Sequence, residues 1–187
     1  MSKIDLNNIS HSYNPNDPNP IYALNPFSMT WENGKRYAIL GPSGCGKTTM
    51  LNIVSGLVRP SAGTILFDDK DVTDLKSESR NIAQVFQFPV IYNTMTVYEN
   101  LAFPLKCRDF LKDKIDERVK SVADTLNLQS FLNSPARKLT ADQKQLISLG
   151  RGLVREDVAA VLMDEPLTVI DPDWKLRLRG KRNEIYE

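Results

Sequence analysis

The segment that most limits the fold of this chain is Gly41–Thr49, which reads Gly-Pro-Ser-Gly-Cys-Gly-Lys-Thr-Thr. It matches the pattern G-x-x-x-x-G-K-[ST] and follows the apolar run Arg36–Leu40. Glycines let successive backbone N–H groups turn inward around an anion, and a following helix directs its positive dipole end at the same point. A strand, this loop and a helix together predict a nucleotide-phosphate site rather than a plain glycine-rich turn.

The residue types in this loop indicate separate roles. Lys47 has the reach to contact the β- and γ-phosphates, and the Thr48 hydroxyl is suited to ligate Mg²⁺. The residues expected to bind the nucleotide here are Gly41, Pro42, Ser43, Gly44, Cys45, Gly46, Lys47, Thr48 and Thr49.

A second motif combines an apolar run with two carboxylates. Val161–Met163 is followed directly by Asp164 and Glu165. Asp164 is expected to hold the Mg²⁺ shell, and Glu165 is the candidate to take a proton from an attacking water. A solvated strand end is the alternative for such a pattern alone, but its position after a phosphate-binding loop favours the functional interpretation.

Short apolar runs alternate with helical patterns along the chain. This order predicts an α/β fold with a mainly parallel central sheet. The early strands are closely spaced, with the exposed loop Asn14–Pro20 among them, so an antiparallel N-terminal part is expected. Strands are expected at Ile4–Leu6, Tyr22–Leu24, Ser28–Trp31, Arg36–Leu40, Thr64–Phe67, Ile82–Phe86 and Val158–Met163. Helices are expected after Gly46 and at Thr96–Phe103, Lys112–Leu126, Asp142–Val154 and Pro172–Ile185.

Composition excludes several classes of protein. The 24 basic and 23 acidic residues give a net charge of +1, so nothing indicates a nucleic-acid partner or an anionic membrane surface. No stretch approaches the roughly 18 apolar residues of a membrane span, which argues against direct membrane insertion. The two cysteines, Cys45 and Cys107, are too few for a disulfide scaffold and indicate a reduced cytosolic setting.

In the order of these motifs the chain resembles the ATP-binding subunits of ABC transporters, over nearly its whole length. The resemblance implies one domain over residues 1–187, with a P-loop NTPase (RecA-like) core, an N-terminal antiparallel β-subdomain and a helical subdomain inserted at about residues 96–150. It implies ATP and Mg²⁺ as ligands and ATP hydrolysis as the activity. Leu139–Gln145 and the run after it are most similar to glycerol and glycerol-3-phosphate importer ATPases, within the carbohydrate-importer group.

The resemblance assigns further site residues. Gln87, which follows Ile82–Phe86, matches a glutamine that reaches the Mg²⁺ and the attacking water. Tyr13 matches an aromatic residue that stacks on adenine, although a surface strand tyrosine is the alternative. Asp171 matches the acidic residue of a loop at the interface between two ATPase subunits.

The family signature, usually Leu-Ser-Gly-Gly-Gln, reads Leu-Thr-Ala-Asp-Gln at Leu139–Gln143. The resemblance implies that Thr140 and Gln143 contact the ATP bound by the other subunit. Ala141 and Asp142 replace both glycines, and a carboxylate at that position adds repulsion against the nucleotide. A helix N-cap is the alternative role for Asp142.

The resemblance also implies partners. Phe88–Leu105 is rich in aromatic and soft apolar side chains and matches the segment that receives transmembrane permease subunits, with core packing as the alternative. A second ATPase subunit, identical or different, would complete the sites. The protein is then expected as a peripheral subunit on the cytoplasmic face of the inner or plasma membrane.

Other interpretations of the sequence remain open beside the ABC transporter subunit. The family places a histidine on a strand after the last helix, whereas the one histidine here is His11. We therefore expect the final strands to be missing and this chain alone to hydrolyse ATP poorly. A soluble ABC-type ATPase without a membrane partner, a catalytically incomplete nucleotide-binding fragment and a P-loop kinase are the alternatives.

Overall fold

A computed structural model describes residues 1–166 of the chain. These residues form two compact units, which we describe separately. The first contains Met1–Ala83 and Asp157–Asp164, and the second contains Gln84–Glu156 with residues 165–166. The helix expected at Pro172–Ile185 and the expected interface residue Asp171 lie outside the described residues.

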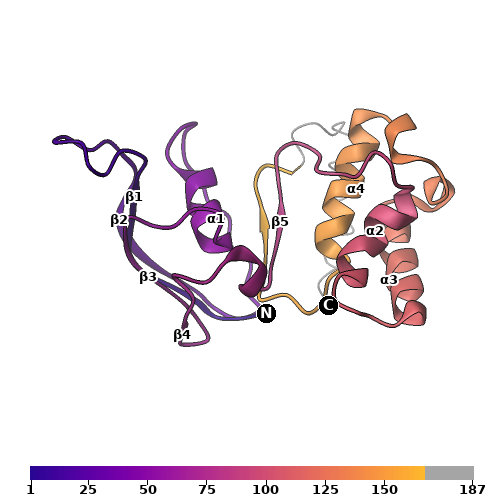
Figure 1. Cartoon of the computed structure of the whole chain (residues 1–187), viewed down its shortest axis with the longest axis horizontal. Coiled ribbons are helices and arrows are strands. Elements are labelled where there is room, and N and C mark those ends of the chain that lie inside the picture. The colour runs from indigo at the N-terminus through magenta and orange to yellow at the C-terminus, as the bar shows by residue number, and fades with distance from the viewer. Residues whose placement is uncertain (167–187) are drawn as a thin grey trace. The chain divides into compact units, whose positions relative to one another are not determined.

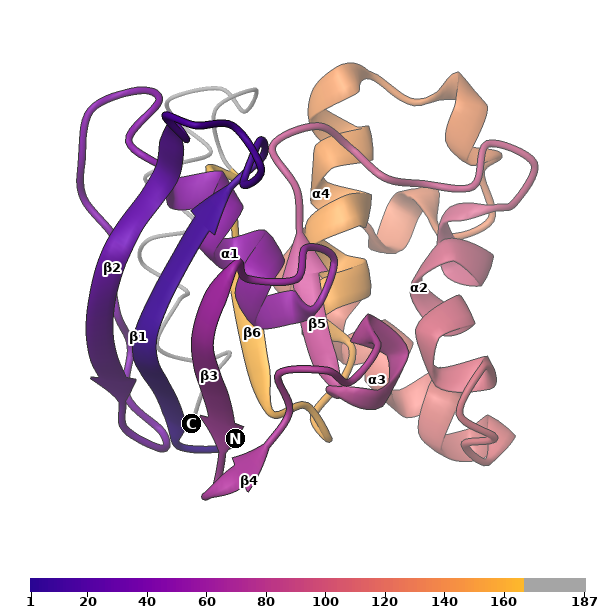
Figure 2. The same cartoon turned by 60° about the vertical axis from the view of Figure 1, so that its left-hand side comes forward.

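The first unit contains a four-stranded sheet in the order β2-β1-β3-β4, with antiparallel pairing throughout (Figure 2). This confirms the antiparallel N-terminal part. The two strands expected at Tyr22–Leu24 and Ser28–Trp31 are one continuous strand, which contains Pro26. A sheet tolerates proline there because this strand lies at the edge, where its missing N–H needs no partner. The strands are β1 (Ile4–Ser12), β2 (Tyr22–Trp31), β3 (Ala62–Phe67) and β4 (Lys70–Asp71).

The helix α1 (Lys47–Ser55) packs with this sheet to form the core of the first unit. Ile53 and Val54 are fully buried among side chains of β1 and β3, such as Ile9 and Ile65. Two further strands, β5 (Ile82–Val85) and β6 (Ala160–Met163), form a second, two-stranded sheet. A short 3₁₀ turn, η1 (Ser77–Ser79), precedes β5.

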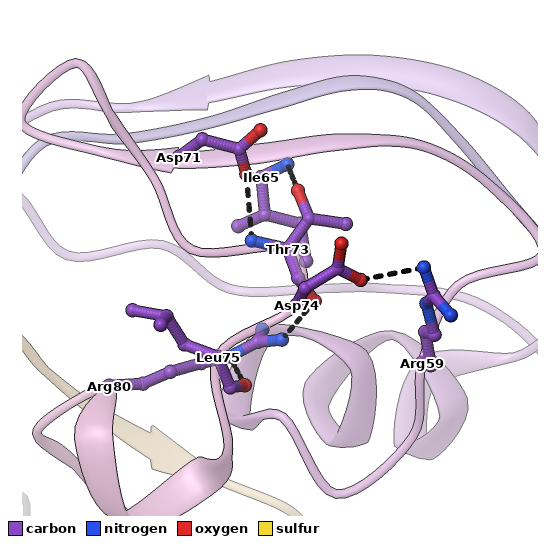
Figure 3. Close-up of polar contacts among 7 residues, drawn as sticks. All are labelled: Arg59, Ile65, Asp71, Thr73, Asp74, Leu75 and Arg80. Carbon is purple, nitrogen blue, oxygen red and sulfur yellow. Dashed lines mark hydrogen bonds and ion pairs between the residues drawn. The ribbon is translucent and has the colours of Figure 1, made fainter.

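Arg80 fastens the end of α1 to the segment before β5. Its guanidinium is almost fully buried and donates to the carbonyls of Ile53 and Val54 at 2.8 and 3.1 Å. It also donates to the carbonyls of Thr73 and Leu75 at 2.7 and 2.9 Å (Figure 3). The guanidinium therefore has four main-chain oxygens in place of a carboxylate partner, and it satisfies two of the orphan carbonyls in the last turn of α1.

The prediction of a strand at Arg36–Leu40 is wrong for the part of the chain that the structure describes. The segment forms no strand, and the side chain of Leu40 is 91% exposed. An apolar run becomes a buried strand only where neighbouring strands satisfy its N–H and C=O groups. Within residues 1–166 no strand pairs with this run.

The second unit is built from α2 (Val97–Lys106), α3 (Lys112–Thr125) and α4 (Ala141–Leu153), which lie together in Figure 1. Short 3₁₀ turns, η2 (Gln129–Phe131) and η3 (Ala136–Lys138), join α3 to α4. The helix expected at Lys112–Leu126 is present as α3, and its apolar residues at helical spacing, Ile115, Val119 and Val122, are buried. Gly150 lets α4 approach α2 closely, because a Cβ there would lie 2.6 Å from Leu101 Cδ2.

None of the helices in the described residues has the length and apolar content to span a membrane.

Candidate functional site

The glycine-rich loop has the backbone that its sequence predicts. Gly44 and Gly46 have φ of 81° and 94°, in the left-handed region. At Gly46 a Cβ would also lie 2.4 Å from the Ala23 carbonyl oxygen, so only glycine fits. Gly46 precedes α1, whose start carries no side-chain cap from the described residues and no acidic residue in its first turn. The N–H groups of that turn thus remain suited to an anion.

Lys47 folds back over the loop. Its Nζ donates to the carbonyl oxygens of Gly41 and Pro42, each at 2.9 Å. The side chain of Cys45 is exposed, and its Sγ lies 4.0 Å from the same ammonium. Two carbonyls therefore hold one positive charge beside the loop, where it is suited to meet phosphate oxygens.

Thr48 and Asp164 come together although 116 positions separate them. The Thr48 hydroxyl donates to Asp164 Oδ2 at 2.7 Å, and the carboxylate is 9% exposed at the end of β6. Mg²⁺ prefers oxygen ligands and usually takes one or two from the protein, with phosphate and water completing its shell. A hydroxyl and a carboxylate at the mouth of a phosphate-binding loop fit that requirement.

Tyr13 lies next to the first turn of α1. Its hydroxyl is 3.2 Å from Thr49 Oγ1, while the ring is 67% exposed. The His11 ring packs edge-on against it with a centroid distance of 4.6 Å. An exposed aromatic face is thus fixed from two sides, which is suitable geometry for stacking on a base.

The residues of the signature segment open α4. Thr140 is the N-cap: its hydroxyl accepts from the Gln143 N–H at 3.3 Å, and Gln143 Oε1 accepts from the Thr140 N–H at 3.0 Å. The alternative role of Asp142 as N-cap is therefore wrong, because the Thr-x-x-Gln spacing forms a capping box one residue before the helix. Asp142 lies in the first helical turn, where the dipole favours its negative charge.

Gln87 and Glu165 belong to the second unit. Gln87 lies two residues after the end of β5 and is exposed. Glu165 is exposed and has φ of 43°, which is uncommon for a residue other than glycine. Both stay candidates for the hydrolytic step: Glu165 was predicted from the acidic end of its strand, and Gln87 from the resemblance to ABC transporter subunits.

Gln145 is a residue that the site prediction omitted. It is fully buried on α4, and its Nε2 donates to the carbonyls of Phe86 at 3.2 Å and Pro166 at 2.9 Å. These carbonyls belong to residues adjacent in sequence to Gln87 and Glu165. The available signal was a glutamine on the apolar side of an amphipathic helix.

Phe88–Leu105 divides into an exposed and a buried part. Phe88, Val90 and Tyr92 are exposed, whereas Leu101 and Leu105 in α2 are buried. We call the exposed part, residues 88–92, the apolar loop. Exposed apolar side chains that lie together are typical of a protein contact.

Two side chains of α4 hold the main chain of this loop. The Val90 N–H donates to Ser148 Oγ at 3.2 Å, and Arg151 Nη1 donates to the Val90 carbonyl at 2.8 Å. The Arg151 guanidinium also lies 4.5 Å from the centre of the Tyr92 ring. The loop therefore has a defined conformation on the helix that begins with the signature residues.

Asn100 of α2 also supports the apolar loop, and its neighbour Glu99 caps the helix. The fully buried Asn100 accepts from the Tyr92 N–H at 2.8 Å and donates to the Tyr92 carbonyl at 3.0 Å. Glu99 accepts from the backbone N–H and hydroxyl of Thr96, and these bonds hold the pKa of the Glu99 carboxyl below its usual range. The ionised form therefore caps α2 at neutral pH.

Comparisons with known proteins agree with this geometry. A sequence profile of the ABC transporter family matches residues 24–168. The trehalose/maltose import ATP-binding protein MalK of Thermococcus litoralis is 41% identical over an alignment of 171 residues, which covers 88% of this chain and 46% of MalK. The sn-glycerol-3-phosphate import ATP-binding protein UgpC of Paracoccus denitrificans is 39% identical over 186 residues, which are 100% of this chain and 51% of UgpC.

A solved structure matches as well. The dimeric post-hydrolysis state of an ATP-binding cassette bound to ADP and Pi superposes with a TM-score of 0.85 at 25% identity, over 98% of this chain and 83% of that one. The chain spans about half the length of the curated relatives it matches. The fold class and the family identified from the motif order are thereby confirmed, and ATP hydrolysis is the activity of that family. From its loop, its strand ends and these relatives, the chain belongs to the ABC transporter family, as an ATP-binding domain.

Proposed function

We propose that this chain binds ATP with Mg²⁺ and, paired with a second ATP-binding subunit, hydrolyses it to drive solute import through transmembrane permease subunits. The contact between Thr48 and Asp164 carries the proposal, because it joins the loop and the acidic strand end that such a reaction requires. The protein would act as a peripheral subunit on the cytoplasmic face of the membrane.

The residues divide the work as follows. Lys47 and the N–H groups at the start of α1 bind the β- and γ-phosphates. Thr48 and Asp164 hold Mg²⁺, with Gln87 as a further ligand, and Tyr13 stacks on adenine. The metal, when bound, would neutralise charge between the phosphates. Glu165 accepts a proton from the attacking water, a role typically worth about 10²- to 10⁴-fold in rate.

The second ATP site would be completed across a pair of subunits. Thr140 caps α4 by accepting a hydrogen bond, which leaves its own hydroxyl proton for a γ-phosphate held by the partner. Gln143 and Asp171 would contribute to the same interface. The solved relative that superposes on this chain is dimeric, which supports pairing. Whether the two chains are identical or different is open to measurement.

The apolar loop is the proposed contact for the permease subunits. Its main chain is held on α4, and its side chains are presented outward. The printed names of MalK and UgpC refer to trehalose/maltose and sn-glycerol-3-phosphate import. We therefore propose a sugar, glycerol or glycerol-3-phosphate as the solute, on similarity alone.

The test uses the full-length protein that contains this chain, reconstituted with its permease subunits. Lys47→Ala should weaken ATP binding, whereas Glu165→Gln should retain binding and lower kcat by about 100-fold or more. A matched control is Lys70→Ala in β4, away from the loop, which should change neither quantity. Equal turnover in the wild type and Glu165→Gln would contradict the proposal.

One observation favours a second candidate, a nucleotide-binding module with little turnover. Asp142 stands where the signature usually has glycine, and its charge opposes a nucleotide phosphate. ATP binding without measurable hydrolysis in the reconstituted complex would favour this candidate.

A further inference from the structure

We propose that Gln145 is a positioning residue that fixes the two loops bearing Gln87 and Glu165 relative to each other. This inference rests on the proposed function of those two residues in hydrolysis. The observation that carries it is a single buried amide group between the carbonyls of Phe86 and Pro166.

The chemistry of the contact requires an amide NH₂ group. Both neighbours are carbonyl oxygens, which accept and cannot donate, at 3.2 and 2.9 Å from Gln145 Nε2. The two N–H bonds of one NH₂ group serve both oxygens. A carboxylate of the same size would place oxygen against oxygen, and an apolar side chain of the same length would leave both carbonyls unsatisfied.

The two carbonyls lie next to the residues proposed for the hydrolytic step. Phe86, the first residue after β5, immediately precedes Gln87, and Pro166 immediately follows Glu165. Glu165 is held with φ of 43°, which requires support from its surroundings. Movement of either carbonyl therefore displaces a residue of the proposed hydrolytic step.

The oxygen of the Gln145 amide indicates that this residue does more than fill space in the core. Gln145 is 0% exposed, and its Oε1 has no hydrogen-bond partner among the described residues. An unsatisfied buried acceptor is unfavourable, so an apolar residue would suit the interior of α4 better if packing alone mattered. Gln145 also lies two positions after Gln143, on the helix that Thr140 caps. One helix thus carries the signature residues and the amide that holds both loops.

The test compares Gln145→Met and Gln145→Glu with Arg118→Met in the full-length protein. Arg118 is a matched control because it also serves two carbonyls, those of Leu153 and Val154 at the far end of α4, at 2.9 and 3.1 Å. We expect Gln145→Met to lower kcat by about 100-fold, as a misplaced catalytic group does, with the Kd for ATP within about two-fold of wild type. Gln145→Glu should be at least as impaired. Arg118→Met should keep wild-type kcat per folded molecule.

Hydrogen exchange provides a readout independent of turnover. In Gln145→Met the amides around Phe86–Phe88 and Glu165 should exchange faster than in wild type and in Arg118→Met. Wild-type kcat together with unchanged exchange in Gln145→Met would overturn the inference. If the wild type shows no hydrolysis, the proposed function fails, and faster exchange would still support the positioning role while unchanged exchange would overturn it.

Discussion

At the scale of single residues, Tyr13 is held by its hydroxyl as well as its ring. The hydroxyl lies 3.2 Å from Thr49 Oγ1, at the start of α1. We expect Tyr13→Phe to weaken ATP binding by about two- to ten-fold, since one hydrogen bond contributes about 0.5–1.5 kcal/mol. Tyr13→Ala should weaken it further because the stacking surface is lost. Calorimetric titration with ATP measures both, and Tyr22→Phe on β2 is the control. Equal affinity of Tyr13→Phe and wild type would show that the hydroxyl does not orient the ring.

The conformation of the glycine-rich loop could be predicted because what determines it is local. Gly46 has a left-handed backbone, and Lys47 folds back over the loop. Both features depend on residues that are close together in the sequence. Gln145 could not be predicted in the same way. Its partners, Phe86 and Pro166, are 59 and 21 positions away, and only the tertiary fold brings two carbonyls to one amide.

At the scale of elements, Arg80 joins the C-terminal end of α1 to the segment before β5, where its bonds to Thr73 and Leu75 are drawn in Figure 3. Burial lowers the pKa of its guanidinium, while the charges of Asp74 and Asp71 oppose that shift. We expect Arg80→Met to reduce the free energy of unfolding by about 2–4 kcal/mol, because buried carbonyls lose a charged donor. Arg59→Met is the control: its pair with Asp74 at 2.7 Å is exposed and should cost about 0–1 kcal/mol. Urea unfolding would contradict this expectation if the two variants were equally stable.

Helices whose apolar residues recur at helical spacing were predicted well. Strands that depend on pairing with residues far away in the sequence were not. The helix α3 was predicted from the period of apolar residues in its own sequence, and those residues are buried. The run Arg36–Leu40 has the composition of a buried strand but no strand to pair with in residues 1–166. The hairpin of β3 and β4 was not predicted, because its turn uses Asp68 and Asp69 with φ of 48° and 64°, whereas the usual signals, Asn-Gly and Asp-Gly, have glycine at the second position.

At the scale of the whole molecule, the proposed function requires a second ATP-binding subunit. The proposed site needs signature residues from a second subunit, and in this chain they occupy the first turn of α4. Asp142 is favourable for its own helix, through the dipole, and unfavourable for a partner's nucleotide, through repulsion. The stability of the chain and the affinity of the pair therefore place opposite demands on this position.

Asp142→Gly should strengthen ATP-dependent pairing of the full-length protein and weaken its fold. Removal of a carboxylate about 4 Å from a phosphate oxygen in a water-like medium contributes about 1 kcal/mol, or about five-fold in the dissociation constant. Loss of the carboxylate from the first turn of α4 should cost about 0.3–1 kcal/mol of stability, and glycine adds a few tenths of a kcal/mol because it is a poorer helix former than aspartate. Sedimentation with ATP, in a Glu165→Gln background that retains the nucleotide, measures the pairing. Asp142→Asn separates the two causes, since it removes the charge and keeps the Cβ. If it strengthens pairing as much as glycine does, the charge alone is responsible, and if neither variant pairs more tightly, Asp142 does not face a partner's nucleotide.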